Sequence, residues 1–130
     1  MEFEVKSPIL GFENVLKMEL QKIDDVFMKL YNVDSNHVPS FTLINPFVLR
    51  DYNFEVPTAI EVLLDINDKS KDILIANIVV VYKEIKDSTI NFLAPIIFNF
   101  SNKTMAQVVL DALKYPNYGI NESISKYLKQ

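Results

Sequence analysis

Short runs of alternating apolar and polar residues follow one another along most of the chain. Residues 2–6 and 16–20 alternate with a period of two, which is the period of a strand with one buried face. In the second run, Leu16, Met18 and Leu20 share the apolar side. The pattern therefore predicts two strands near the N-terminus.

Four further runs are rich in aromatic and β-branched residues, which favour strands. Residues 26–32 and 40–46 are two such runs, and residues 73–85 form the most strongly β-branched one, so we expect that strand to be central and buried on both faces. Residues 89–93 are predicted to return as its hairpin partner. Pro95 then interrupts the ladder, and residues 96–100 resume it.

Helical periodicity is confined to two short segments. Pro57 precedes residues 58–64, where apolar residues recur at spacings of three and four, and this spacing predicts a short helix. Asn121 is a plausible cap for a terminal helix with Ile124, Tyr127 and Leu128 on one face. Residues 105–113 fit either a helix or a continued hairpin, and we favour a strand. So many short strands with tight turns predict a mainly β fold, a small barrel or sandwich with one or two short helices.

Composition narrows the class of protein. The 130 residues, 49% of them hydrophobic, are typical of one domain spanning 1–130. Two glycines are too few for phosphate-binding loops. A net charge of −4, with Arg50 as the sole arginine, disfavours direct nucleic-acid binding. The lack of cysteine, of an export signal and of an 18-residue apolar run predicts a cytoplasmic protein with no membrane segment.

Candidate catalytic groups are sparse. His37 is the only histidine and lies in a polar turn, so nucleophilic catalysis by a common triad would depend on it alone. The neighbouring acids Asp24 and Asp25 are conceivable acid–base groups, although adjacent acids in turns are usually solvated. We expect no enzyme activity, metal or cofactor. The alternative is a small-molecule-binding barrel or minor hydrolase that uses Asp24, Asp25 or His37.

Two asparagines stand out in the charge-free stretch 88–102. Asn91 and Asn99 flank Pro95 among large apolar residues, where an unpaired amide costs about 1–3 kcal/mol. One interpretation is that their side chains bind loose backbone groups at the Pro95 bend. The other is that one of them faces the main chain of a protein partner.

Three stretches resemble one known family in the same order. They are "SPILGFE" at 7–13, "FTLINPFVLRDYNFE" at 41–55 and "TINFLAPIIFNFSNKTMAQVVL" at 89–110. The chain resembles the flagellar assembly factor FliW family, in which a Gly-Phe-Glu turn, an Asn-Pro-Phe segment and an Asn-Leu-x-Ala-Pro-Ile segment recur. Phe92 stands where leucine is commoner, and residues 115–130 match nothing in that pattern.

The resemblance implies a small antiparallel β-barrel that binds proteins in the cytoplasm and has no enzyme activity. It implies two partners, flagellin and the RNA-binding translational repressor CsrA. Once flagellin has been exported, the freed protein is expected to bind and antagonise CsrA. Such a switch couples flagellin synthesis to secretion. We expect a monomer.

Family positions can be carried onto this chain one by one. Those implied to contact protein partners are Asn45, Phe47, Tyr52, Phe54, Glu55, Asn91, Asn99 and Gln107. Phe47, Tyr52 and Phe54 could line a groove for an amphipathic segment of flagellin. The net negative charge of the chain would attract a basic repressor.

Overall fold

The computed structural model describes residues 1–127, which contain nine strands, one α-helix and four single 3₁₀ turns. The strands are β1 (Glu2–Ser7), β2 (Lys17–Lys22), β3 (Phe27–Asn32), β4 (Ser40–Ile44), β5 (Ile73–Val80), β6 (Thr89–Ile90), β7 (Ile96–Asn99), β8 (Thr104–Gln107) and β9 (Glu122–Ser123). The helical elements are α1 (Thr58–Leu64), η1 (Ser35–His37), η2 (Pro46–Val48), η3 (Ile85–Asp87) and η4 (Ile124–Lys126).

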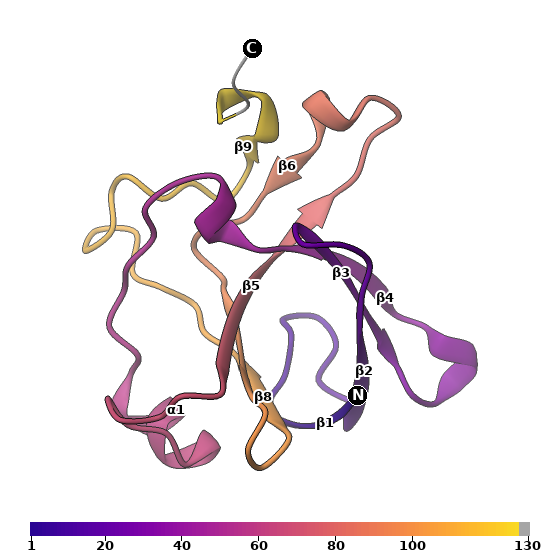
Figure 1. The fold of residues 1–130 in the computed structure, drawn as a ribbon, viewed down its shortest axis with the longest axis vertical. Coiled ribbons are helices and arrows are strands. Elements are labelled where there is room, and N and C mark those ends of the chain that lie inside the picture. Colours follow the sequence, from indigo (N-terminus) through magenta and orange to yellow (C-terminus); the bar gives the residue numbers. More distant parts are fainter. Residues whose placement is uncertain (128–130) are drawn as a thin grey trace.

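Seven of the strands described within residues 1–127 close into a barrel (Figure 1). Their order is β4-β3-β2-β1-β8-β7-β5, and β4 pairs with β5 to complete the ring. The pairs are antiparallel except for β1 and β8, which run parallel. The prediction of a mainly β fold and a small barrel is confirmed. Strands β6 and β9 extend the sheet beyond the closure, from the end of β5.

Alternation along the strands fills the barrel. Phe3 of β1 and Phe98 of β7 are almost fully buried, and their ring centroids lie 5.1 Å apart. Their neighbours in this core come from the inward positions of β2, β3, β4, β5 and β8: Met18, Leu20, Met28, Leu30, Leu43, Ala76 and Met105. Strand β5 pairs with β4, β6 and β7 and is central, as predicted.

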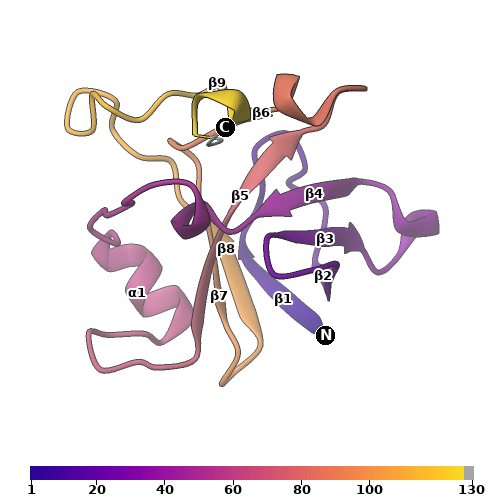
Figure 2. The same cartoon turned by 45° about the horizontal axis from the view of Figure 1, so that its top comes forward.

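Two smaller apolar clusters cover the outside of the barrel. Ile75 and Val79 of β5 face outward, so this strand is buried on both faces. Leu64 of α1 packs with Ile97 and Ala106 against β7 and β8. Figure 2 shows α1 lying beside the barrel, with the chain between β4 and α1 crossing the same side. The helix at 58–64 has the predicted bounds, with Pro57 as its N-cap.

Several predicted strand ends were wrong. Leu16 precedes β2 and is 72% exposed, because only Met18 and Leu20 reach the core. Strand β5 ends at Val80 rather than at residue 85, since its last ladder pair joins Val80 to Thr89 of β6. The strand predicted at 89–93 ends at Ile90, where Asn91 begins a turn.

The C-terminal third also differs from expectation. The predicted strand at 105–113 is confirmed only as β8, and turns follow it. In place of a terminal helix capped by Asn121, the two residues of β9 lead into the single turn η4, capped by Ser123. Leu128, which was placed on that helix, lies outside the described residues. Within residues 1–127, the single α-helix is too short to cross a membrane.

Candidate functional site

The chain leaves the barrel between β4 and α1 as an irregular segment, residues 45–57. Asn45 starts it, because the Asn45 side-chain oxygen accepts a hydrogen bond from the Phe47 N–H at 3.0 Å and caps η2. Pro46 occupies the first position of η2, where its missing N–H costs nothing. The Asn-Pro-Phe motif therefore turns the chain out of the sheet.

Tyr52 fastens this segment to the barrel. The Tyr52 hydroxyl donates to the Phe92 carbonyl and accepts from the Asn77 side-chain amide at 3.1 Å. Asn77 also donates to the Asn91 carbonyl at 3.0 Å, while its Oδ1 atom is buried without a partner among the described residues. Burial raises the pKa of Tyr52, so the phenol stays neutral. The result is a buried polar network between β5, the 45–57 segment and the turn after β6.

Aromatic rings surround Tyr52. Its ring centroid lies 4.8 Å from that of Tyr118, 5.5 Å from those of Phe54 and Phe92, and 6.2 Å from that of Phe47. Tyr52 is only 3% exposed, whereas Phe47 is 52% exposed. Three predicted site residues, Phe47, Tyr52 and Phe54, thus come together. Phe47 is the member that presents most surface to solvent.

Arg50 ties the C-terminal segment to this cluster, a role that sequence reasoning missed. Its guanidinium carbon lies 4.9 Å from the ring centroid of Tyr118 and 5.5 Å from that of Tyr127. It also donates to the Tyr127 hydroxyl at 2.8 Å and pairs with the Glu122 carboxylate at 3.5 Å. An arginine can stack on aromatic rings and donate forked hydrogen bonds at once, so the presence of a single arginine was the sequence feature that could have indicated this role.

Glu122 is the anionic partner in this arrangement. Burial would raise the pKa of Glu122, but hydrogen bonds from the Tyr127 hydroxyl, the Gly119 N–H and the Lys126 ammonium outweigh it and hold that pKa below its usual value. The carboxylate therefore remains ionised beside Arg50. Residues 115–127 run alongside the 45–57 segment and form a strap that is hydrogen-bonded to it (Figure 2).

Glu55 lies at the other end of the 45–57 segment, on the surface. Its carboxylate accepts from the Lys114 ammonium at 2.7 Å, and this bond lowers the pKa of Glu55. The Glu55 N–H donates to the Tyr115 hydroxyl at 2.8 Å, which fixes the backbone there. Beside this pair is a groove of about 360 Å³ between residues 55–58 and 109–115. Val109, 60% exposed, lies along it.

The remaining predicted residues bind their own chain. The Asn91 side-chain oxygen accepts from the Leu93 N–H at 3.0 Å, so Asn91 shapes the bend before Pro95 and joins the Tyr52 network through its carbonyl. Asn99 donates to the Leu64 carbonyl at 2.8 Å and thereby holds the end of α1. Gln107 accepts from the Leu10 N–H at 2.9 Å. Asn99 and Gln107 are buried and lie apart from the aromatic cluster.

The groups of the hydrolase alternative are separated. Asp24 and Asp25 lie in the turn before β3, and His37 lies in the turn after it, so β3 stands between them. The Asp24 carboxylate accepts from the N–H groups of Phe27 and Val26, and these bonds lower its pKa. His37 contacts the Asn32 carbonyl at 3.1 Å and is exposed.

The geometry defines a class first: a small closed β-barrel that carries an anchored surface segment, with an exposed aromatic residue and an acidic groove edge. Comparison with known proteins then gives the family. The family model described as "FliW protein" matches residues 1–124.

Two relatives and one solved structure agree with this match. Flagellar assembly factor FliW 2 of Wolinella succinogenes is 55% identical over 127 residues, which cover 98% of this chain and 92% of that protein. Flagellar assembly factor FliW of Sulfurimonas denitrificans is 49% identical over 130 residues, the full length of both. A crystal structure of the flagellar assembly factor FliW is 23% identical and superposes with a TM-score of 0.85, covering 99% of this chain and 87% of that one. The chain belongs to the FliW family.

Proposed function

We propose that this protein is a cytoplasmic flagellar assembly factor that binds flagellin, and that it also binds and antagonises the translational repressor CsrA. Binding of flagellin would occupy the protein while flagellin accumulates. Export of flagellin would release the protein to capture CsrA, so that flagellin synthesis follows secretion. Family membership supports the assembly role, and the surface of the 45–57 segment supports binding by shape and charge.

The observation that carries the proposal is the exposed Phe47 at one end of a rigidly fastened segment whose other end borders an open groove. An amphipathic helix binds by laying its apolar face into such a groove, with anchors one turn apart. Phe47 and Val48 are about half exposed, and Val109 and Leu113 are more so. An amphipathic terminal segment of flagellin, unprotected before assembly, is the occupant that we propose for this surface.

Charge supports the second partner. A repressor that binds RNA must present basic surface, and this chain has a net charge of −4. Glu55 is 82% exposed and is held in place by Lys114, so a basic group can approach it without a large desolvation cost.

Binding is the whole of the proposed activity. The protein would act as a monomer without a cofactor and would make or break no covalent bond. A small-molecule or hydrolytic role for Asp24, Asp25 or His37 has weaker support, because these residues lie at opposite ends of β3.

Isothermal titration against purified flagellin and purified CsrA tests the proposal. We expect heat of binding with both partners, and we expect Glu55→Lys to weaken CsrA about fivefold while flagellin changes less. Glu84→Lys is the matched control, because it makes the same charge change at an exposed position before η3. No heat with either partner would overturn the proposal. Equal losses for both partners in Glu55→Lys would overturn the assignment of Glu55 to the basic partner.

A further inference from the structure

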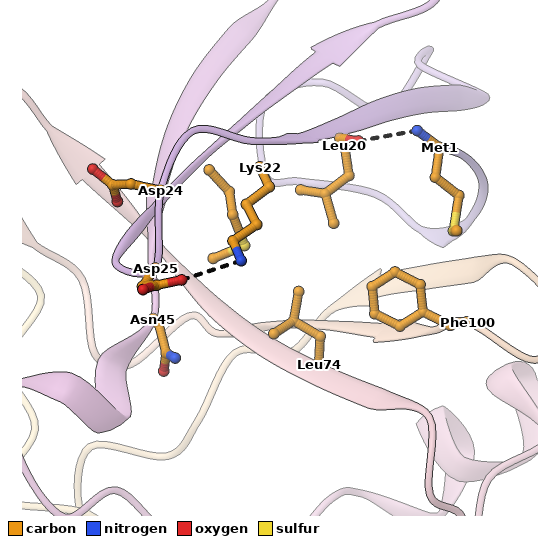
Figure 3. Close-up of a pocket in the computed structure, with 9 residues that line it drawn as sticks. Met1, Leu20, Lys22, Asp24, Asp25, Asn45, Leu74 and Phe100 are labelled. Carbon is orange, nitrogen blue, oxygen red and sulfur yellow. Dashed lines mark hydrogen bonds and ion pairs between the residues drawn. The ribbon is translucent and has the colours of Figure 1, made fainter.

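One end of the barrel interior is open as a cavity of about 410 Å³ (Figure 3). Its walls are Leu20, Met28, Leu74 and Phe100, from strand ends that meet at this end of the barrel, together with Met1. Leu20 and Met28 belong to the main core, so the cavity continues that core outward. Cavities of this size that are lined by apolar side chains and sit in the mouths of β-barrels are typical binding sites.

Charged groups are confined to the rim. Lys22 and Asp25 pair within the β2–β3 turn at the mouth, with 3.1 Å between the ammonium nitrogen and a carboxylate oxygen (Figure 3). Their side chains are 71% and 96% exposed, so this ion pair contributes little and exchanges readily. Asp24 adds a second negative charge to the same turn, fixed by two backbone N–H groups. The α-ammonium of Met1 also lies at the cavity but pairs with Glu19, so the rim carries two carboxylates against the one lysine.

We infer that this mouth is a docking site for a large apolar side chain that a protein partner presents next to a lysine or arginine. The apolar group would enter the cavity, and the flanking cation would replace Lys22 beside Asp25. Met1 and Met28 suit the role, because unbranched methionines adjust to side chains of different shape. Asn45 also lines the mouth and starts the 45–57 segment, so an occupant here would adjoin that segment.

The topology favours binding through side chains that enter the cavity over binding by addition of a strand. The barrel is closed by the β4–β5 pairing, so the strands around the mouth are already paired on both sides. A partner that reaches this end must be recognised by side chains that enter the cavity. This site shares only Asn45 with the 45–57 segment, and its test uses neither flagellin nor CsrA, so the two proposals can fail independently.

The chain has four methionines, which provide reporters and controls together. Met1 and Met28 line the cavity, whereas Met18 and Met105 are buried in the core at 1% and 0% exposure. With ¹³C-methyl methionine, the protein is titrated with the peptide acetyl-Ala-Lys-Leu-Lys-Ala-amide. We expect saturable shifts of the Met1 and Met28 methyl signals and unchanged Met18 and Met105 signals.

Three comparison ligands separate the contributions of the leucine, the lysines and the peptide chain to binding. Replacing the leucine by serine should remove most of the shift, and replacing both lysines by glutamate should weaken binding. Hexylammonium, a free amphiphile, should bind more weakly than the peptide. Asp25→Asn should weaken the peptide about threefold, while the control Asp68→Asn, at another exposed position, should not.

Four results would overturn the inference. These are no shift with the lysine peptide, equal shifts of all four methionines, equal binding of the lysine and glutamate peptides, and binding of hexylammonium without binding of the peptide. The last result would assign the cavity to a small amphiphile instead.

Discussion

The change Tyr52→Phe tests how the 45–57 segment is held. It removes one oxygen atom and keeps the ring, so the contacts with Tyr118, Phe54 and Phe92 persist. The Phe92 carbonyl loses the hydroxyl that donates to it, and Asn77 loses one of its two acceptors. Both residues are fully buried, so water cannot easily replace the lost bonds.

The expected loss follows from those two groups. A buried polar group left without a partner costs about 1–3 kcal/mol, and Asn77 keeps its bond to the Asn91 carbonyl, so we expect a total of about 2 kcal/mol. For a chain of this size, that corresponds to a fall of about 1 M in the urea midpoint. The control Tyr31→Phe removes a hydroxyl whose bond to Gln21 lies at the surface, and it should cost less than about 0.5 kcal/mol.

Urea unfolding followed by far-UV circular dichroism measures both variants, since the chain has no tryptophan to report by fluorescence. The reasoning holds if Tyr52→Phe loses stability and Tyr31→Phe does not. Equal midpoints for the two variants, or a Tyr52→Phe protein as stable as the wild type, would refute the claim that the network anchors the segment.

Three further predictions concern the strap and the exposed surface. Arg50→Lys loses stacking on Tyr118 and Tyr127 and should lower the free energy of unfolding by about 1–2 kcal/mol in urea titrations. Glu122 has a folded-state pKa below the usual 4.5, so its contribution to the free energy of unfolding is present above pH 4.5 and is lost as the pH falls through the folded-state pKa. Between about pH 5 and 3, the stability of Glu122→Gln should therefore fall less than that of the wild type. Phe47→Ala should leave stability within about 0.5 kcal/mol but weaken flagellin binding about tenfold by calorimetry.

Local pattern was sufficient for the barrel strands and for α1. Period-two alternation located β1 and β2, and aromatic and β-branched content located β3 and β4, each to within a few residues. Pro57 marked the start of α1 because it stands just before the first helical turn. Strand length was harder to predict, since β5 stops at its last pair with β6 although its β-branched residues continue to Val81.

The site could be predicted only in part. The Asn-Pro-Phe and aromatic residues were identified from motifs, and the structure places Phe47, Tyr52 and Phe54 in one cluster. Asn77 and the strap could not be found this way, because their partners are 14 or more positions distant in the chain. Such contacts depend on tertiary packing, which no local window contains. The lone Arg50 was the one compositional sign of the strap.

The central claim is that partners bind the exterior formed by residues 45–57 and the adjoining groove at 109–115. Hydrogen–deuterium exchange of the protein, alone and saturated with full-length flagellin, tests it most directly, because it locates the contact without a mutation. Slower exchange in these two segments, with the β2–β3 turn unchanged, is the predicted result. Protection elsewhere on the barrel, with 45–57 and 109–115 exchanging as in the free protein, would contradict the account.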